Sequence, residues 1–428
     1  MKGYEINVHH ITRVEGHGNI VVNVKDGKIE DLRLEIVESP RLFEVMLEGR
    51  PWQDAASITA RICGICALGH TLASIQASED ALGIVPDEET TLLRKLLLHG
   101  ETIQSHILHL YFLVAPDVFE VGSVVPLATT HPEVVKRALR LKKLGNEMCE
   151  ILVGRKVHPI GMMPGGFTRW PLPEDLRRVR SILEAARPDL EATVELFRGI
   201  KMPELDRPTE YFALKKAGEY AFLNGDIASS FGKVTPVQTY LERISERVVA
   251  HSAAKQVKGT ESSVAVGALA RFNINHEQLL PWAKSVMKAL GLKPPVTNPF
   301  HNNTAQLLEV LHCYEDSFRL LDELQARKGY VHRMKEPTRH GRGVGGTEVP
   351  RGLLYHDYTI GEDGRIAHAN CIIPTGQNLA NIEGDMHKLV GDMAGKEPAS
   401  IQRGLEMLVR AYDPCISCAT HFLEIEFV

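Results

Sequence analysis

Two C-x-x-C pairs lie near opposite ends of this sequence, and they constrain its fold more than any other feature. The first pair is Cys63 and Cys66, and the second is Cys415 and Cys418. The spacing lets both thiolates of a pair turn toward one metal ion, and four thiolates form a soft ligand set suited to nickel, iron, zinc or copper(I). If both pairs hold one metal site, the fold must bring the two ends of the chain together.

A zinc ribbon and a thioredoxin-like redox pair are the ordinary explanations of a C-x-x-C motif. A zinc ribbon closes its second pair within a few tens of residues, because its metal substitutes for a small core. This chain has 428 residues, 44% of them hydrophobic, and can bury a large core without a metal. The metal is therefore expected to take part in chemistry.

The net charge and the three remaining cysteines limit which binding partners and which cellular compartment we expect. A formal net charge of -5 gives no reason to expect nucleic acid or an anionic membrane as a partner. No apolar run of about 18 residues predicts a membrane span, and residues 1–5 lack the features of a secretory signal. Cys149, Cys313 and Cys371 are scattered, and we expect them to be reduced and buried. These features favour the cytoplasm.

Hydrophobic periodicity predicts an α+β fold that is mainly helical. Alternating apolar residues over 4–37 indicate short antiparallel strands. Apolar residues at three- and four-residue spacings indicate long helices at 92–114, 176–200 and 304–334. We expect a core of long bundled helices, with small antiparallel β elements near the N-terminus and the C-terminus.

The chain contains no repeat or linker that would divide it. Residues 1–50 are expected to be a β-rich N-terminal part, and 51–335 a helical core. Residues 336–428 are expected to be a mixed part that brings the second cysteine pair to the first. The sequence therefore predicts a single interleaved domain over 1–428.

The residues that flank each cysteine pair suggest how the thiolates are held. Cys66 leads into a predicted helix, and backbone N–H groups at a helix N-terminus lower the pKa of a thiol. His70 follows one turn later, so its ring is expected to hydrogen-bond the sulfur of Cys66. Pro414 ends the helix before the second pair, and Asp413 is expected to accept hydrogen bonds beside the metal ligands.

These motifs resemble those of the large, catalytic subunit of nickel-iron hydrogenases. The sequence R-I-C-G-I-C-A-L-G-H ends at His70, and D-P-C-I-S-C-A-T-H ends at His421. The match extends to R-V-E-G-H at 13–17, to Glu44 within 41–50, and to E-V-P-R-G at 348–352, and therefore spans essentially the whole chain.

The resemblance implies a Ni–Fe centre on the four cysteines. Cys63 and Cys415 would bind nickel terminally, while Cys66 and Cys418 would bridge nickel and iron. The iron of this family also carries carbon monoxide and cyanide ligands. The residues alone support a soft metal on four thiolates, and the second metal comes from the resemblance.

The cleavage of dihydrogen requires a group that accepts a proton. The thiolate of Cys415 can take it first, and Glu15, which matches the family's glutamate, is the expected relay. Arg351 is expected to aim a positive charge at the open coordination site. The alternatives are a salt bridge between Glu15 and Arg13, and a structural pairing of Arg351 with Asp413.

The resemblance also assigns roles to residues around the centre. Pro374 and Thr375 occupy the place of the apolar pocket around the iron's ligands, where Thr375 would donate to a cyanide nitrogen; an ordinary core strand is the alternative. Glu44, the backbone carbonyl of Cys371 and His421 resemble the family's magnesium site, although the imidazole leaves room for Fe2+. For Glu44 alone, the alternative is a solvated helix charge.

The chain departs from the family pattern in two places, and it also contains a misleading motif. Ser105 stands where many members have an aspartate, and serine supplies neither a charge nor a proton base. Residues 422–428 are either removed by a maturation protease or kept as a tail.

The run at 341–346 satisfies G-x-G-x-x-G, but Pro350 follows it closely, so we expect a glycine-rich loop and no bound nicotinamide.

The sequence holds no further cysteine cluster, so electrons must pass to another chain. We expect an iron–sulfur small subunit, and diaphorase or electron-transfer subunits that bind flavin and NAD(P) or a deazaflavin, as in the cytoplasmic branch of the family. Two alternatives are a relative of the quinone-site subunit of respiratory complex I, which lacks the metal cysteines, and a Zn(Cys)4 scaffold protein. A plain zinc site would not explain why Glu15, Arg351 and Thr375 all occur in motifs of this family.

Overall fold

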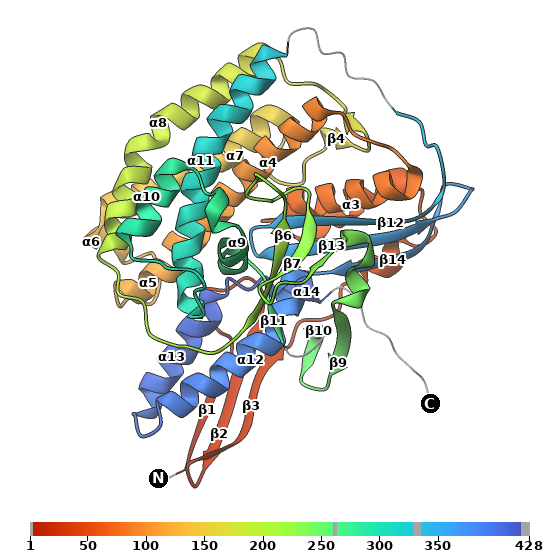
Figure 1. Ribbon diagram of the computed structural model, residues 1–428. Coiled ribbons are helices and arrows are strands. Elements are labelled where there is room, and N and C mark those ends of the chain that lie inside the picture. Colours follow the sequence, from red (N-terminus) through yellow and green to blue (C-terminus); the bar gives the residue numbers. More distant parts are fainter. Residues whose placement is uncertain (1–2, 260–262, 328–334, 421–428) are drawn as a thin grey trace, which may run out of the picture.

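The computed structural model describes residues 3–259, 263–327 and 335–420. The predicted fold class is confirmed, since long helices predominate and the strands form small sheets (Figure 1). No helix in these ranges is both long and apolar enough to span a membrane.

Four long helices pack side by side and form the largest core (Figure 1). They are α4 (Glu88–Leu108), α7 (Pro132–Val153), α8 (Pro173–Arg198) and α11 (Asn302–Ala326). Buried leucines at helical spacing, such as Leu93 and Leu97 on α4, explain the association. The helix expected at 92–114 is α4 continued by a π-helical turn, and the one expected at 304–334 ends at Ala326 before residues outside the described ranges.

The remaining helices are shorter and surround this bundle or connect it to the sheets. They are α1 (Phe43–Leu47), α2 (Ala55–Thr59), α3 (Ala67–Leu82), α5 (Ala115–Val118), α6 (Leu127–Thr130), α9 (Ala268–Asn275), α10 (Pro281–Ala289), α12 (Pro374–Asp392), α13 (Pro398–Ala411) and α14 (Ile416–Ala419). Of these, α3, α12 and α14 begin beside the cysteine pairs or the Pro374 segment, and they position the site.

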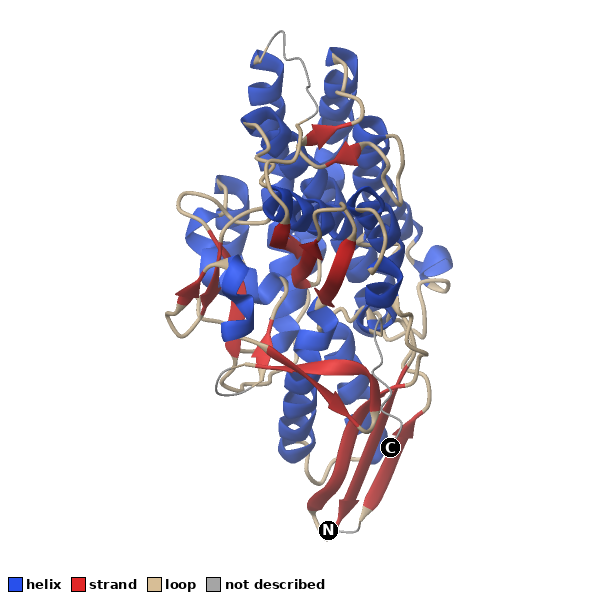
Figure 2. Ribbon diagram, turned by 90° about the vertical axis from the view of Figure 1, so that its right-hand side faces the viewer, coloured by secondary structure: helices blue, strands red, loops and turns tan. Residues whose placement is uncertain are grey.

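A five-stranded sheet contains the N-terminal strands predicted from the sequence. Its order is β1 (Tyr4–Val8), β2 (Gly18–Lys25), β3 (Lys28–Ile36), β10 (Ser252–Lys258) and β9 (Ser245–Val249). The first three strands pair antiparallel, whereas β10 joins β3 in parallel at Ser252 and Ile36. Figure 2 shows these long strands at the lower end of the molecule.

Strands in the middle of the chain correct the expectation of helices throughout 51–335. Besides β9 and β10, this region holds β4 (Met162–Met163), β5 (Gly166–Phe167), β6 (Glu210–Lys215), β7 (Asp226–Ser229), β8 (Val234–Thr235) and β11 (Val264–Ala265). A four-stranded sheet has the order β11-β6-β7-β8. The apolar positions of β6 are buried on both faces, and such a short apolar run carries no period that separates a strand from a buried helix.

The glycine-rich run expected to be a loop is instead a strand. A three-stranded antiparallel sheet consists of β12 (Gly341–Val349), β13 (Gly352–Ile360) and β14 (Ile366–Ile372). A Cβ atom at Gly343 or Gly345 would collide with the backbone of α3. The glycines therefore let β12 lie directly on α3, which holds the first cysteine pair beside this sheet.

Candidate metal centre

The four cysteines from opposite ends of the chain converge at one buried point. Their sulfur atoms lie within 4.8 Å of one another, and Cys63 Sγ is 3.6 Å from Cys415 Sγ. Cys66 caps the N-terminus of α3, and the N–H groups of Ile65 and Cys66 donate to Cys63 Sγ, both at 3.3 Å. The convergence on which the sequence interpretation depends is therefore present.

The thiols of this cluster differ in acidity. Hydrogen bonds from Cys415, Cys418 and Cys66 lower the pKa of Cys63 well below its ordinary value. Burial raises the pKa of both Cys415 and Cys418. Four thiolates in this volume repel one another strongly, so they require bound cations to stay deprotonated together. The ligand set thus fits one or two soft metal ions.

The structure shows the pairing of Arg351 with Asp413, and the action of Arg351 on an open coordination site stays a prediction. It is 3% exposed; its Nε donates to the Asp413 carbonyl at 2.8 Å, and its Nη2 donates to Asp413 Oδ1 at 2.9 Å. Burial lowers its pKa, but the charges of Asp413 and of three of the cysteine thiolates outweigh burial and raise it. Its Nη1 is buried and lacks a hydrogen-bond partner within the described residues. That N–H group is free to act on a bound molecule.

Glu15 lies directly against the second cysteine pair. Its Oε2 accepts from Cys415 Sγ at 3.1 Å and from the N–H of Ser417 at 3.2 Å, while its backbone pairs with Cys415 and Ile416. The alternative of a Glu15–Arg13 salt bridge is wrong, because Arg13 pairs instead with Asp117 at 2.6 Å. The carboxylate is therefore in hydrogen-bond contact with a sulfur of the cysteine cluster.

Thr375 also contacts the second cysteine pair. Its hydroxyl oxygen accepts from the N–H of Cys415 at 2.8 Å, which leaves the hydroxyl hydrogen available for another acceptor. Pro374 is the first residue of α12, and β14 ends at Ile372. The alternative of an ordinary core strand through this segment is therefore wrong.

Glu44 is buried, so the alternative of a solvated helix charge is wrong. It is 4% exposed, and its Oε1 accepts from the backbone N–H of Cys371 at 2.8 Å. The two described members of the expected magnesium site are therefore adjacent, whereas His421 lies outside the described residues. His70 places its Nδ1 3.2 Å from His356 Nε2, and its backbone N–H donates to the Cys66 carbonyl.

Sequence reasoning singled out Ser105 but missed the buried polar residues four positions before and after it. Glu101, Ser105 and His109 are all buried and lie four residues apart, so they share one face of the helix. Glu101 accepts from the N–H groups of Leu68 and Gly69 at the start of α3, and burial raises its pKa to about 8. The Ser105 hydroxyl has no partner among the described residues. The signal available in the sequence was the four-residue spacing of polar residues at 101, 105 and 109.

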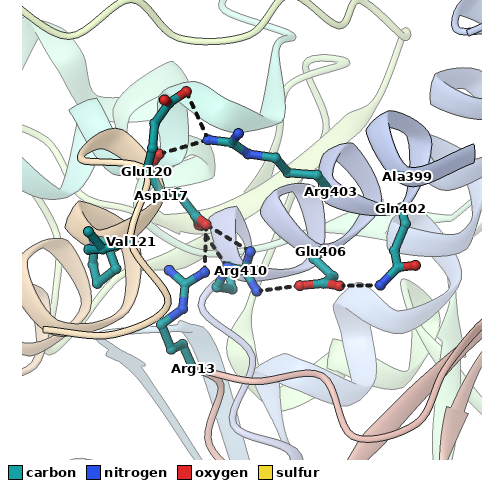
Figure 3. A pocket seen from close by; sticks show the side chains of 10 residues that line it. Arg13, Asp117, Glu120, Val121, Ala399, Gln402, Arg403, Glu406 and Arg410 are labelled. Atoms are coloured by element: carbon teal, nitrogen blue, oxygen red, sulfur yellow. Dashed lines mark hydrogen bonds and ion pairs between the residues drawn. The ribbon is translucent and has the colours of Figure 1, made fainter. Parts of the chain in front are cut away.

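A cavity of about 290 Å³ has Arg13, Asp117 and Arg410 in its wall and none of the cysteines (Figure 3). Figure 3 shows Arg13 and Arg410 converging on Asp117. The Arg410 guanidinium donates to both Asp117 oxygens, at 2.7 and 2.9 Å. The cavity thus has a wall of arginine–carboxylate pairs that fixes Arg410 firmly.

The sequence matches the family described as nickel-dependent hydrogenase over residues 41–136 and 230–421. Residues 5–39 match a family described as HoxL-like. The alpha subunit of sulfhydrogenase 1 from Pyrococcus furiosus is 36% identical over 422 residues, which cover 98% of each chain. A chain of the F420-non-reducing hydrogenase from Methanothermobacter marburgensis is 31% identical, with 98% of this chain and 95% of that one covered.

A solved structure has the same fold. The structure of an NAD+-reducing NiFe-hydrogenase in its H2-reduced state matches with a TM-score of 0.87 at 26% identity, covering 98% of this chain and 99% of that chain.

Proposed function

Because the chain belongs to the nickel-dependent hydrogenase family, as a catalytic large subunit, we propose that its cysteine cluster holds a Ni–Fe centre. Cys63 and Cys415 would hold the nickel, and Cys66 and Cys418 would be shared by the nickel and the iron. The observation that carries this assignment is the group of four buried sulfur atoms within 4.8 Å. The reaction is the reversible cleavage of dihydrogen into protons and electrons.

When bound, the centre supplies the electrophile that draws the electron pair of dihydrogen. Arg351 adds a fixed positive charge that stabilises negative charge as it develops at the reacting atoms. Asp413 holds the guanidinium through Nε and Nη2, so the free Nη1 is presented without reorganisation.

The proton leaves through Cys415 and Glu15. The sulfur of Cys415 takes the proton, and Glu15 Oε2, 3.1 Å away, accepts it from the sulfur. A carboxylate suits this relay because it accepts a proton and releases it again at modest cost. The N–H of Ser417 holds the same oxygen in place at 3.2 Å.

Thr375 and Pro374 serve the ligands of the iron, which we propose to be carbon monoxide and cyanide. Since the Thr375 oxygen already accepts from the N–H of Cys415, its hydrogen is directed to another acceptor, such as a cyanide nitrogen. Pro374 carries no N–H group, so at the first turn of α12 it presents an apolar wall.

We propose a second, hard cation on Glu44, the Cys371 carbonyl and His421. Support comes from the burial of Glu44 and from its contact with the backbone of Cys371. A buried carboxylate gains stability from a cation, and oxygen ligands favour Mg2+, or Fe2+ when an imidazole takes part.

The electrons pass to an iron–sulfur small subunit. Cys149, Cys313 and Cys371 are buried and outside the one cysteine cluster found among the described residues. Beyond the small subunit, we propose diaphorase or electron-transfer subunits with flavin and NAD(P), in the cytoplasm. The name of one relative specifies NAD+ and that of another excludes F420, which favours NAD(P) over a deazaflavin. A maturation protease would remove residues 422–428 if the chain is a precursor.

Infrared spectroscopy of the purified complex, together with nickel and zinc analysis, tests this function. We expect bands of metal-bound carbon monoxide and cyanide, with nickel in stoichiometric amount. Cys418→Ala should remove the bands, whereas Cys313→Ala, which alters a buried cysteine outside the cluster, should keep them. Stoichiometric zinc without the bands would refute the hydrogenase assignment.

A further inference from the structure

The two halves of the metal site come from separate cysteine segments. The first segment is 61–66 and the second is 413–420. Within the described residues, each hydrogen bond directly between the two segments involves a sulfur atom, such as the contact of Cys63 with Cys415. Four thiolates repel one another before a cation is bound, so these contacts are weakest in the chain that still has to bind its metal. A link that does not depend on sulfur would keep the segments together at that stage.

Arg41 supplies such a link, although it belongs to neither segment and lies between β3 and α1. Its backbone N–H donates to the Thr420 carbonyl at 2.6 Å, which anchors residue 41 on the second segment. Its side chain reaches the first segment, where Nη1 donates to the Ile62 carbonyl at 2.6 Å and Nη2 to the Arg61 carbonyl at 2.9 Å. A longer contact of 3.4 Å joins Nη1 to the Ser417 carbonyl of the second segment.

The first segment needs support on the side where Arg41 binds it. Gly64 is exposed, and a Cβ atom added there would meet no other atom within 4 Å, so packing does not fix this part of the loop. Gln104 of α4 holds the later part by donating to the Ile65 carbonyl at 2.8 Å. Arg41 holds the carbonyls of the two residues before Cys63. The two side chains therefore fix the loop from opposite ends.

The shape of an arginine side chain suits this position. Its planar guanidinium spans two adjacent carbonyl groups, whereas a lysine ammonium is a point donor on a flexible stem. The Arg41 guanidinium also lies over the ring of Phe43, 4.9 Å from the centroid, and Phe43 is buried in the apolar cluster that contains all four cysteines. The Ile62 carbonyl that Arg41 binds lies 4.0 Å from Cys418 Sγ. The guanidinium is thus one contact away from a sulfur atom of the second pair.

We propose that Arg41 is a positioning residue that ties the two cysteine segments together and thereby sets how tightly the site binds its metal. The anchored backbone of residue 41 fixes one end of the link, and the guanidinium fixes the other end just before Cys63. A preformed site binds a metal more tightly, because less ordering of the chain opposes binding. The importance of Arg41 for a Ni–Fe centre rests on the proposed function, but the link between the segments does not.

Hydrogen exchange in the metal-free full chain, read by mass spectrometry under reducing conditions, tests the link itself. Arg41→Gln keeps the backbone N–H that donates to Thr420 but lacks the guanidinium. We expect the peptide that contains the N–H groups of Ile65 and Cys66 to exchange roughly tenfold faster, while peptides from α8 keep their rate. An unchanged rate at 61–66 would overturn the proposal. An equal rise in α8 would also overturn it, because it would show a general loss of stability.

Arg365→Gln is a matched control for this measurement. Arg365 also donates to a backbone carbonyl far away in the chain, that of Gly49, at 2.7 Å, but it contacts neither cysteine segment. Its replacement should leave the exchange at 61–66 unchanged. Faster exchange at 61–66 in Arg365→Gln would show that loss of any such arginine loosens the loop, and would refute a specific role of Arg41.

Binding of cobalt(II) to the metal-free full chain tests the consequence for the site. Thiolate-bound cobalt absorbs visible light, so its affinity can be measured by competition with a chelator. We expect Arg41→Gln to bind cobalt about ten- to hundredfold more weakly than the wild type, as when other groups that orient metal ligands are removed. Arg41→Lys keeps the charge without the two-point contact and should be weakened as much. Wild-type affinity in Arg41→Lys would refute the proposal, because the charge alone would then suffice.

This proposal and the proposed function fail separately. A complex with the infrared bands, in which Arg41→Gln leaves the exchange at 61–66 unchanged, would support the function and refute the link. Stoichiometric zinc without the bands, in a chain where Arg41→Gln speeds that exchange, would do the reverse.

Discussion

Glu15→Gln is the most direct test of the proton route. Gln retains an oxygen that accepts from the N–H of Ser417, now 3.2 Å from Oε2, and the backbone bond from Ile416 to the carbonyl of residue 15 is unaffected. The free energy of unfolding should therefore change by less than about 1 kcal/mol. An amide cannot take the proton from the Cys415 sulfur 3.1 Å away. Loss of that transfer should slow turnover by roughly 10²–10⁴, or about 3–5 kcal/mol in activation free energy.

The assay is hydrogen-dependent reduction of a redox dye, normalised to nickel content, with thermal unfolding measured in parallel. Glu38→Gln is a matched control, because Glu38 is a partly buried carboxyl that accepts from the N–H of His17 on the same segment. Its activity should stay near that of the wild type. A Glu15→Gln enzyme with more than about a tenth of wild-type turnover, at equal nickel content, would refute Glu15 as the main proton relay.

Three further perturbations have outcomes that follow from burial. Arg351→Met leaves the Asp413 carboxylate buried without its charge partner and should lower the free energy of unfolding by about 3–5 kcal/mol, measured by denaturant titration; no loss would refute the pairing. The pKa of Glu101 is raised to about 8 in the folded chain, so the folded state binds this proton more tightly than the unfolded one. Stability should therefore fall, by up to about 1.4 kcal/mol per pH unit, as pH rises from the unfolded pKa through about 8. Glu101→Gln should reduce this slope in unfolding midpoints measured from pH 6 to 8, most clearly above pH 7, and an unchanged slope would assign it elsewhere. A chelator should lower the unfolding midpoint of the wild type but not of Glu44→Gln, whereas the exposed control Glu48→Gln should respond as the wild type does.

The parts of the site that the sequence predicts are those whose chemistry repeats at fixed spacing. Cys63 and Cys66, and likewise Cys415 and Cys418, can be recognised in the sequence because the C-x-x-C spacing lets two thiolates reach one soft metal ion. Their convergence was predicted without any contact information, since a half-set of ligands has no evident use. The fold class followed from helical periodicity, which is strong in long amphipathic segments.

Other features depend on distances that a sequence does not contain. The run at 341–346 is a strand that packs directly on α3, because Gly343 and Gly345 have no Cβ to collide with the backbone of that helix. The glycines alone do not tell which element packs against them. Glu44 is buried and accepts from the N–H of Cys371, a residue far away in the chain. Gln306 likewise belongs to no motif, and its contacts with His109 and Asp413 can be seen only in the folded chain.

Because Glu15 pairs with Cys415, the site can form only after the C-terminal cysteine pair has been synthesised. Cys63 and Cys415 are 352 residues apart, and closing a loop of this length costs about 5 kcal/mol of chain entropy, which only the packing of the finished chain can offset. At the rate of ribosomal synthesis, the second cysteine pair is made on the order of half a minute after the first. During that interval two thiols are open to oxidants and to competing metals. Loading of the centre therefore belongs to the end of synthesis, and a chain that stops short of Cys415 is left with half of its ligands.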